Sequence, residues 1–175
     1  MKKLELSLSA KGRFLVSCED ANGNHKWGVS SHNLVVDVGL ERMNDIFFTG
    51  ESYTANWYVG IYGPQSENKP NPRDTARVHP GWTEITDYLS SVRPAVEFGK
   101  ASNASPSVIT NDAKPARFTV TKEQKIGGAF LIDNDIKGGM NGNLFCVTDF
   151  PSPGDRLLEE GDVLNISYEF YLGAG

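Results

Sequence analysis

Side chains that could bind a metal ion are few and scattered. The histidines are His25, His32 and His79. No two of them stand at a spacing that would place both on one metal ion. The segment Asp133–Asp135 has the oxygen-rich start of a calcium-binding loop, but the third acidic position and the terminal glutamate are missing. The sequence therefore predicts no metal and no cofactor, and we interpret residues 133–142 as a turn-rich hairpin loop.

No side chain stands in the setting of a catalytic nucleophile. Cys146 lies between Phe145 and Val147, an apolar environment that raises the pKa of a thiol and makes it inert. The sequence contains no Gly-x-Ser-x-Gly motif and no glycine-rich phosphate-binding loop. The adjacent acids Glu159 and Glu160 fall in a predicted surface turn, where we expect no acid–base catalysis. We therefore predict that the protein is not an enzyme.

Aromatic side chains flank a proline-rich segment, residues 63–80, which we expect to project as a loop and to reach a neighbour if the protein assembles. Surface aromatic residues beside such a loop could stack on sugar rings or anchor a protein interface. The alternative is that most of them fill the core. The candidate partner-binding residues are Trp57, Tyr62, Pro70, Pro72, Arg73, His79 and Trp82.

The clearest periodicity is in the C-terminal segment 161–173. Its apolar and polar side chains alternate after a Gly-Asp turn, which predicts a strand with one face on the core. The segment 127–132 is a short unbroken apolar run, which indicates a strand buried on both faces. We predict that the C-terminal strand is central in its sheet and that residues 127–132 form its partner.

The N-terminus begins with strand-like runs and not with an export signal. Lys2 and Lys3 would suit a signal peptide, but residues 4–9 alternate apolar and polar side chains and build no continuous apolar region. A second run at 12–18 and the turn signal at 21–24 indicate a hairpin. We therefore expect a soluble protein that is intracellular when synthesised.

The segment 33–48 is the one good helix candidate. Asp37 near its start suits the helix dipole, and Gly50 would end the helix. Gly39 weakens the candidate, because glycine costs about 1 kcal/mol against alanine inside a helix. The residues expected to share one apolar stripe are Val36, Leu40, Met43 and Phe47.

The other strands complete an all-β pattern. They are expected at 57–62, 81–86, 92–98, 116–121 and 143–147. Gly60 is expected to leave room for a neighbouring ring, and Pro94 indicates a sheet edge or a bulge. A second long polar loop is expected at 100–114. About eight strands and one short helix predict a two-sheet β-sandwich or jelly-roll-like fold, as a single domain over residues 1–175.

Composition and charge narrow the classes of partner. The 18 glycines and 9 prolines in 175 residues suit many short strands joined by turns. A formal net charge of -5 disfavours binding to nucleic acid or to anionic lipid. No window is apolar for long enough to cross a bilayer. Cys18 and Cys146 both lie in apolar strand-like segments, where we expect free buried thiols and no disulfide.

A series of short motifs is distributed over residues 10–172. The motifs are Asn33-Leu34-Val35, Gly39-Leu40, Trp57-Tyr58-Val59-Gly60, His79-Pro80-Gly81-Trp82-Thr83-Glu84, Arg93-Pro94-Ala95, Pro115-Ala116 with Phe118, Gly127-Gly128-Ala129-Phe130-Leu131 and Gly161-Asp162. In this order they resemble the motifs of a family of small virion proteins of tailed bacteriophages. The shared residues are mostly glycines, prolines and core aromatics, so they indicate turn geometry and packing and bring no catalytic residue with them.

The resemblance implies a structural protein of the virion, assembled in the cytoplasm of the bacterial host. Our first hypothesis is a capsid cement or decoration protein, oligomeric or symmetry-related on the shell, that binds and stabilises the major capsid protein and contacts copies of itself. The second is a tail or neck adaptor or a fibre-attachment component. The third, from a different class, is a carbohydrate-binding module that contacts the host surface through Trp57, Trp82 or the tyrosines beside the loop.

Overall fold

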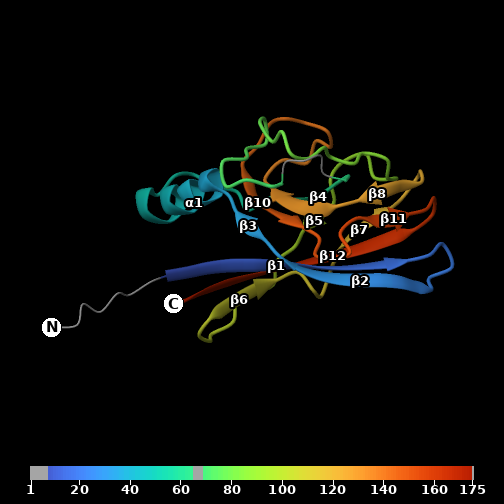
Figure 1. The fold of residues 1–175 in the computed structure, drawn as a ribbon. Helices are drawn as coiled ribbons and strands as arrows, with labels where there is room; N and C mark the ends of the chain where they lie inside the picture. Colours follow the sequence, from blue (N-terminus) through green and yellow to red (C-terminus); the bar gives the residue numbers. More distant parts are fainter. Residues whose placement is uncertain (1–7, 65–68, 175) are drawn as a thin grey trace.

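The computed structural model describes residues 8–64 and 69–174. It is mainly β, with 42% of the residues in strands and 8% in helices, which confirms the predicted all-β class. Two sheets lie one above the other in a sandwich-like arrangement, as Figure 1 shows. The described residues form twelve strands, more than the sequence predicts, because several strands are only two or three residues long.

The first sheet is built around the C-terminal strand. Its strands are β2 (His25–His32), β1 (Leu8–Glu19), β12 (Val163–Ala174), β6 (Ser107–Thr110) and β7 (Ala116–Thr119). β1 and β12 pair antiparallel along their whole length, and β6 and β7 pair with successive parts of the other edge of β12. The prediction that the C-terminal strand is central is confirmed, and so is the N-terminal hairpin of β1 and β2.

The second sheet contains the apolar run 127–132, which the sequence predicts to lie beside the C-terminal strand in the first sheet. In order, its strands are β3 (Leu34–Val35), β10 (Leu144–Asp149), β9 (Gly128–Ile132), β4 (Trp57–Tyr62) and β5 (Ala95–Val96). The predicted pairing of residues 127–132 with the C-terminal strand is therefore wrong, because β9 lies between β10 and β4. All five residues of β9 are buried, as predicted. An apolar run predicts burial, but it does not specify which strand lies beside it.

The main core fills the space between the two sheets. A small third sheet, of β8 (Gln124–Ile126) and β11 (Arg156–Leu158), adds Ile126 and Leu158 to this core. The first sheet contributes Phe14, Ile166 and Tyr168, all at most 1% exposed. Burial of a side chain of this size contributes about 1.5–3 kcal/mol, so the main core is the principal source of stability.

A second apolar cluster covers the outer face of the second sheet. Its members are Val36, Tyr62, Ala76, Trp82, Phe130, Ile132, Leu144 and Val147. The loops that provide part of this cover lie above the second sheet in Figure 1. The prediction that residues 63–80 project from the body is wrong for the part around Asp74 and Ala76, which are 4% and 6% exposed. Residues 65–68 of that segment lie outside the described residues.

Several other predicted boundaries differ from the structure. The loop predicted at 100–114 contains strand β6. The strand predicted at 81–86 is reduced to one bridge between Glu84 and Tyr62. The strand predicted at 92–98 is limited to β5, which lies at a sheet edge as Pro94 indicates. Residues 4–7 of the first predicted run lie outside the described residues, and the rest of it joins the second run in β1.

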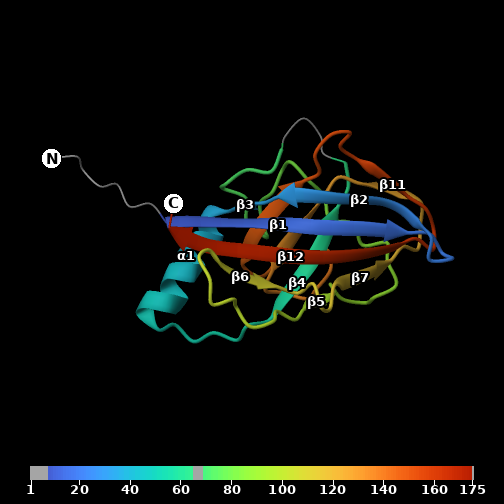
Figure 2. The same cartoon turned by 90° about the horizontal axis from the view of Figure 1, so that it is seen from below.

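A helix is present in the predicted segment 33–48 and projects from one end of the sandwich (Figure 2), but it begins only at Asp37, because Leu34 and Val35 form strand β3. Helix α1 (Asp37–Asn44) continues into η1 (Asp45–Thr49), one turn of π-helix. Gly50 ends it in the left-handed conformation, with φ of 73°, as predicted. Asp37 lies in the first turn, where a carboxylate favours the positive end of the helix dipole.

The predicted apolar stripe is only half confirmed, since Val36 is buried and Met43 packs against the core but Leu40 and Phe47 are exposed. Leu40 and Phe47 are 41% and 79% exposed. The residue in closest contact is Gly39, where a Cβ would lie 2.4 Å from the carbonyl oxygen of Phe145. Met43, four residues further along, lies on the same face and packs against the core. Phe47 lies beyond α1 in the π-helical turn η1, where the 3.6-residue period assumed for the stripe no longer holds.

Candidate interaction surface

The structure divides the predicted partner-binding residues between core and surface. Tyr62 and Trp82 are 0% and 5% exposed, so both pack inside the protein. The Trp82 indole donates a hydrogen bond to Asp74 Oδ2 at 3.0 Å, and the Tyr62 hydroxyl donates one to the carbonyl of Thr148 at 2.5 Å. Burial with a satisfied polar atom is typical of a structural aromatic residue.

The other predicted partner-binding residues do not form one site. Pro72 and Arg73 are exposed, and Pro70 is half-buried. His79 is half-buried and stacks on Trp82, with ring centroids 3.8 Å apart. Trp57 is half-buried and lies away from this loop, beside Tyr53 and Phe145. The structure therefore brings His79 and Trp82 together and places Trp57 in a different part of the surface.

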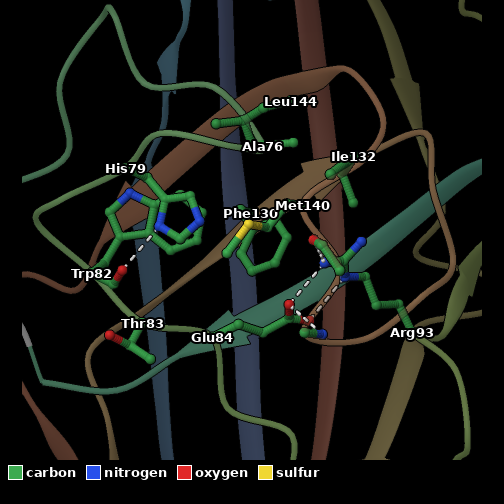
Figure 3. Close-up of a pocket in the computed structure, with 12 residues that line it drawn as sticks. Ala76, His79, Trp82, Thr83, Glu84, Arg93, Phe130, Ile132, Met140 and Leu144 are labelled. Carbon is green, nitrogen blue, oxygen red and sulfur yellow. Dashed lines mark hydrogen bonds and ion pairs between the residues drawn. The ribbon is translucent and has the colours of Figure 1, made fainter.

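A cavity of about 180 Å³ lies on the outer side of the second sheet, and Figure 3 shows the residues that line it. Its polar end is a buried ion pair between Arg93 and Glu84, whose side chains are 2% and 8% exposed. The Arg93 guanidinium donates to both carboxylate oxygens of Glu84, at 2.8 and 2.7 Å. It also donates to the carbonyls of Asn134 and Gly139. These contacts join the segment between β4 and β5 to the loop between β9 and β10, which indicates a structural role.

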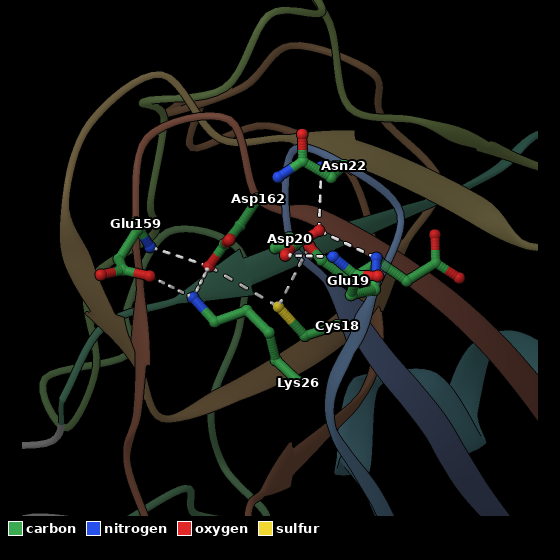
Figure 4. Close-up of polar contacts among 8 residues, drawn as sticks. Cys18, Glu19, Asp20, Asn22, Lys26, Glu159 and Asp162 are labelled. Carbon is green, nitrogen blue, oxygen red and sulfur yellow. Dashed lines mark hydrogen bonds and ion pairs between the residues drawn. The ribbon is translucent and has the colours of Figure 1, made fainter.

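A second polar cluster lies at the far end of the first sheet, between β2 and the turn before β12 (Figure 4). Lys26 Nζ donates to Asp162 Oδ2 at 2.7 Å and to Glu159 Oε2 at 2.6 Å. Asp162 is 2% exposed and also accepts a hydrogen bond from the backbone N–H of Glu159 at 2.9 Å. The hydrogen bond to Asp162 is the main cause of the raised pKa of Lys26. The cluster therefore holds the turn against the hairpin.

The two cysteines are free and fully buried. Burial raises the pKa of the Cys146 thiol to about 12. Burial, and then the carboxylate of Asp162, raise the pKa of Cys18 to about 12. The predictions that Cys146 is an unreactive thiol and that the cysteines remain unpaired agree with this environment.

Among the large apolar side chains of residues 8–64 and 69–174, the two most exposed are adjacent phenylalanines on η1. Phe47 and Phe48 are 79% and 78% exposed, and their rings contact each other edge to face at 4.9 Å. We call these two residues the aromatic pair. A side chain this large normally loses most of its surface to the core, so two such residues together on a projecting turn indicate a contact surface.

An apolar groove of about 400 Å³ lies beside the aromatic pair. It opens where the helix, the loop after it and the ends of both sheets meet. The residues that define it are Met43, Phe47, Phe48, Tyr53, Trp57, Phe145 and Leu172. Trp57, one of the predicted partner-binding residues, therefore does line a surface that could bind another protein.

The segment that carries the aromatic pair is acidic, although the charged side chain that lines the groove is the basic Arg42. Residues 37–51 contain four acidic side chains, Asp37, Glu41, Asp45 and Glu51, and one basic side chain, Arg42. Arg42 pairs with Glu51 at 2.5 Å and lies over the ring of Tyr53. The segment thus has a formal net charge of -3, against -5 for the whole chain.

Sequence reasoning missed the aromatic pair, because a helical stripe predicts that Phe47 faces the core. The available signal was two consecutive phenylalanines just before the helix stop at Gly50, since adjacent helical residues cannot both face inward. The buried pair of Arg93 and Glu84 was missed as well. Nothing in the local sequence distinguishes these two residues from exposed charges.

Among residues 8–64 and 69–174, no three His, Cys, Asp or Glu side chains are grouped so that they could hold a metal ion. In the same part of the chain, no helix is long and apolar enough to span a membrane. Comparison with protein-family models, with known proteins and with solved structures gives no match for this chain.

Proposed function

We propose that this chain is a non-enzymatic structural protein of a tailed-bacteriophage particle, and that it acts as a capsid cement or decoration protein bound to the major capsid protein. The observation that carries the proposal is the aromatic pair beside the apolar groove. Exposed apolar surface of this kind is typical of a protein interface. The resemblance of residues 10–172 to small phage virion proteins agrees with this role.

The shape of the molecule supports a role in assembly. A short helix projects from one end of the two-sheet body (Figure 1), and the turn η1 that follows it carries the exposed aromatic pair. Many copies bound on one lattice would hold together more strongly than the affinity of each contact suggests, because binding at neighbouring sites is multivalent. A cement protein therefore needs only a modest contact surface on each copy.

No observation favours carbohydrate binding over this role. Trp82 is 5% exposed and packs between His79, Tyr62 and Phe130, so its ring offers no face to a sugar. Trp57 lines the apolar groove, but it packs against Phe145 edge to face at 5.5 Å. Stacking on sugars requires an open ring face.

The test is cryo-electron microscopy of virions assembled with and without this protein. The proposal expects additional density over the icosahedral shell only when the protein is present. It also expects heads that lack the protein to lose integrity sooner on heating or at low ionic strength. Density confined to the neck or tail would instead favour the adaptor hypothesis, and absence from purified particles would refute a virion role.

A further inference from the structure

We propose that Asn141 is a site of spontaneous covalent modification, at which the folded protein converts an asparagine into a mixture of aspartate and isoaspartate. The tripeptide Asn-Gly-Asn occurs twice in the chain, at 22–24 and at 141–143. The two copies have the same residues, but they differ in the hydrogen bonds of the glycine between the asparagines. The reaction needs only the folded chain and water, so this site is independent of the proposed function.

The reaction is the attack of a backbone nitrogen on a side-chain amide. The nitrogen of Gly142 loses its proton to solvent and forms a bond to Cγ of Asn141, which expels ammonia and closes a succinimide ring. One water molecule then opens the ring at either carbonyl. Opening at one carbonyl gives aspartate, and opening at the other gives isoaspartate, whose main chain passes through Cβ. Glycine favours the attack because no Cβ stands beside its nitrogen.

The backbone around Asn141 is free to react. Asn141 and Gly142 are both exposed, so water reaches the amide and the nitrogen. In the described part of the chain, residues 8–64 and 69–174, no group accepts a hydrogen bond from the N–H of Gly142 and none is bonded to the side chain of Asn141. The nitrogen that must lose its proton is therefore held by water alone.

Both copies of the tripeptide are held by an aspartate through their last residue. The backbone N–H and the side-chain amide of Asn143 donate to the two carboxylate oxygens of Asp133, at 2.6 and 2.7 Å. The same groups of Asn24 donate to the two carboxylate oxygens of Asp20, both at 2.8 Å. The last residue therefore does not distinguish the two copies.

The glycine nitrogen does distinguish them. The N–H of Gly23 donates to the carbonyl of Asp20 at 2.9 Å, within the turn between β1 and β2. Asp20 Oδ1 also accepts a hydrogen bond from the N–H of Asn22 at 2.8 Å (Figure 4). A nitrogen that donates a hydrogen bond loses its proton less readily, and the bond must break before the nitrogen can approach Cγ. We therefore expect Asn22 to be protected, although it is also exposed.

Conversion at Asn141 would change the loop between β9 and β10. The product adds one negative charge to a chain whose formal net charge is -5. Isoaspartate also lengthens the main chain between Gly139, whose carbonyl is bonded to Arg93, and Asn143, which is bonded to Asp133. Both products therefore alter the charge of this loop, and isoaspartate alters its path as well.

The test is to incubate the folded protein in mildly alkaline buffer and to map both tripeptides by mass spectrometry. Conversion raises the mass of a peptide by about 1 Da, and an isoaspartate-specific methyltransferase labels the isoaspartate product. We expect Asn141 to convert about fivefold faster than Asn22 or more, because a hydrogen bond must break before Gly23 can react. In guanidinium chloride the two rates should agree within about twofold, since the unfolded tripeptides have the same residues.

Two variants examine the sites separately. Asp20→Ala removes the carboxylate that holds Asn22 and Asn24, and it should raise the rate at Asn22 towards the rate at Asn141. Asn141→Gln is the matched control, because it keeps an exposed amide at this position but would have to close a larger and less favourable ring. It should show no conversion at position 141. Unchanged circular dichroism would show that both variants are folded.

Two results would overturn the assignment. One is conversion of Asn22 at the rate of Asn141 in the folded protein, or an Asn141 that stays intact there. The other is a difference between the two sites that persists unchanged in guanidinium chloride, since the neighbouring sequence and not the fold would then be its cause.

Discussion

Gly39 and Gly60 occupy positions where a side chain would collide with a packed neighbour. A Cβ at Gly60 would lie 2.0 Å from the ring of Phe130, as the sequence predicts for a ring beside this strand. A Cβ at Gly39 would meet the backbone of Phe145, which cannot move aside as a ring can. Single atoms at these positions therefore decide how a strand and a helix pack.

The Gly39→Ala variant tests this close packing, because helix propensity and overpacking predict opposite changes in the free energy of unfolding. Helix propensity alone would stabilise the variant by about 1 kcal/mol. We expect a loss of about 1–3 kcal/mol instead, because overpacking against backbone forces the helix to shift. Urea unfolding measures the difference. Gly28→Ala is the control, since its Cβ would have no neighbour closer than 3.6 Å, and a stabilised Gly39→Ala would contradict the packing described.

The buried thiols predict low reactivity. With a pKa of about 12 for Cys18 and Cys146, almost no thiolate is present at pH 8, so Ellman's reagent should label neither residue in the folded protein. Both should react at once in urea. Rapid labelling of one thiol under native conditions would contradict its burial.

The same shift predicts a pH dependence of stability. The folded thiols keep their protons up to about pH 12, whereas the unfolded thiols lose theirs near pH 9.0. The unfolded state therefore binds fewer protons in this window, and the free energy of unfolding should fall as pH rises from 9 to 12. Urea unfolding of the wild type and of Cys146→Ala at pH 8 and pH 10 measures it, and the variant should show the smaller fall.

At the scale of elements, the pair of Arg93 and Glu84 holds the loops of the outer face together. Glu84 also accepts a hydrogen bond from the backbone N–H of Gly138 at 2.8 Å. Lys137 Nζ adds hydrogen bonds to the carbonyls of Thr86, Tyr88 and Ser90. The loop after β9 is thus fixed to the segment between β4 and β5 by charged side chains as well as by the second apolar cluster.

Glu84→Ala should lower the free energy of unfolding by about 3–5 kcal/mol, because it leaves the buried Arg93 charge without its carboxylate. The control is Glu97→Ala, which removes an ion pair with Lys114 whose side chains are 64% and 68% exposed. That substitution should cost at most about 1 kcal/mol. Unfolding free energies of the two variants give the comparison, and equal costs would show that the Arg93 pair is not effectively buried.

At the scale of the whole molecule, the second sheet belongs to both apolar clusters. Val59, Ile61 and Leu131 face the main core, while Tyr62 and Phe130 belong to the outer cluster. Neither cluster can therefore be lost without exposing one face of the same strands. This geometry predicts that the protein unfolds as one cooperative unit.

Calorimetry tests the prediction of one unit. The calorimetric and van't Hoff enthalpies should agree, and tryptophan fluorescence and far-ultraviolet circular dichroism should report the same transition. Trp82→Phe shows whether the fluorescence change includes the outer cluster, since Trp82 belongs to it. An earlier transition seen only by Trp82 would mean that the outer loops unfold separately from the sandwich.

The sequence by itself determined those features that depend on neighbouring residues. Alternation predicts the strand character of β12 and the turn signal predicts the hairpin of β1 and β2. Gly50 marks the helix end, Pro94 indicates the edge position of β5, and apolar neighbours predict the inert thiol of Cys146. Each of these signals lies within a few residues of the structure that it predicts.

Only the tertiary structure decided which distant segments meet. The pairing of β9 with β10 and β4, the burial of Trp82 and the pairing of Arg93 with Glu84 all join segments that carry no local mark of one another. The close contact between Gly39 and the backbone of Phe145 likewise joins two such segments. The physical reason is that side-chain periodicity fixes which face of an element is apolar, whereas the backbone hydrogen bonds of a strand fit any neighbouring strand.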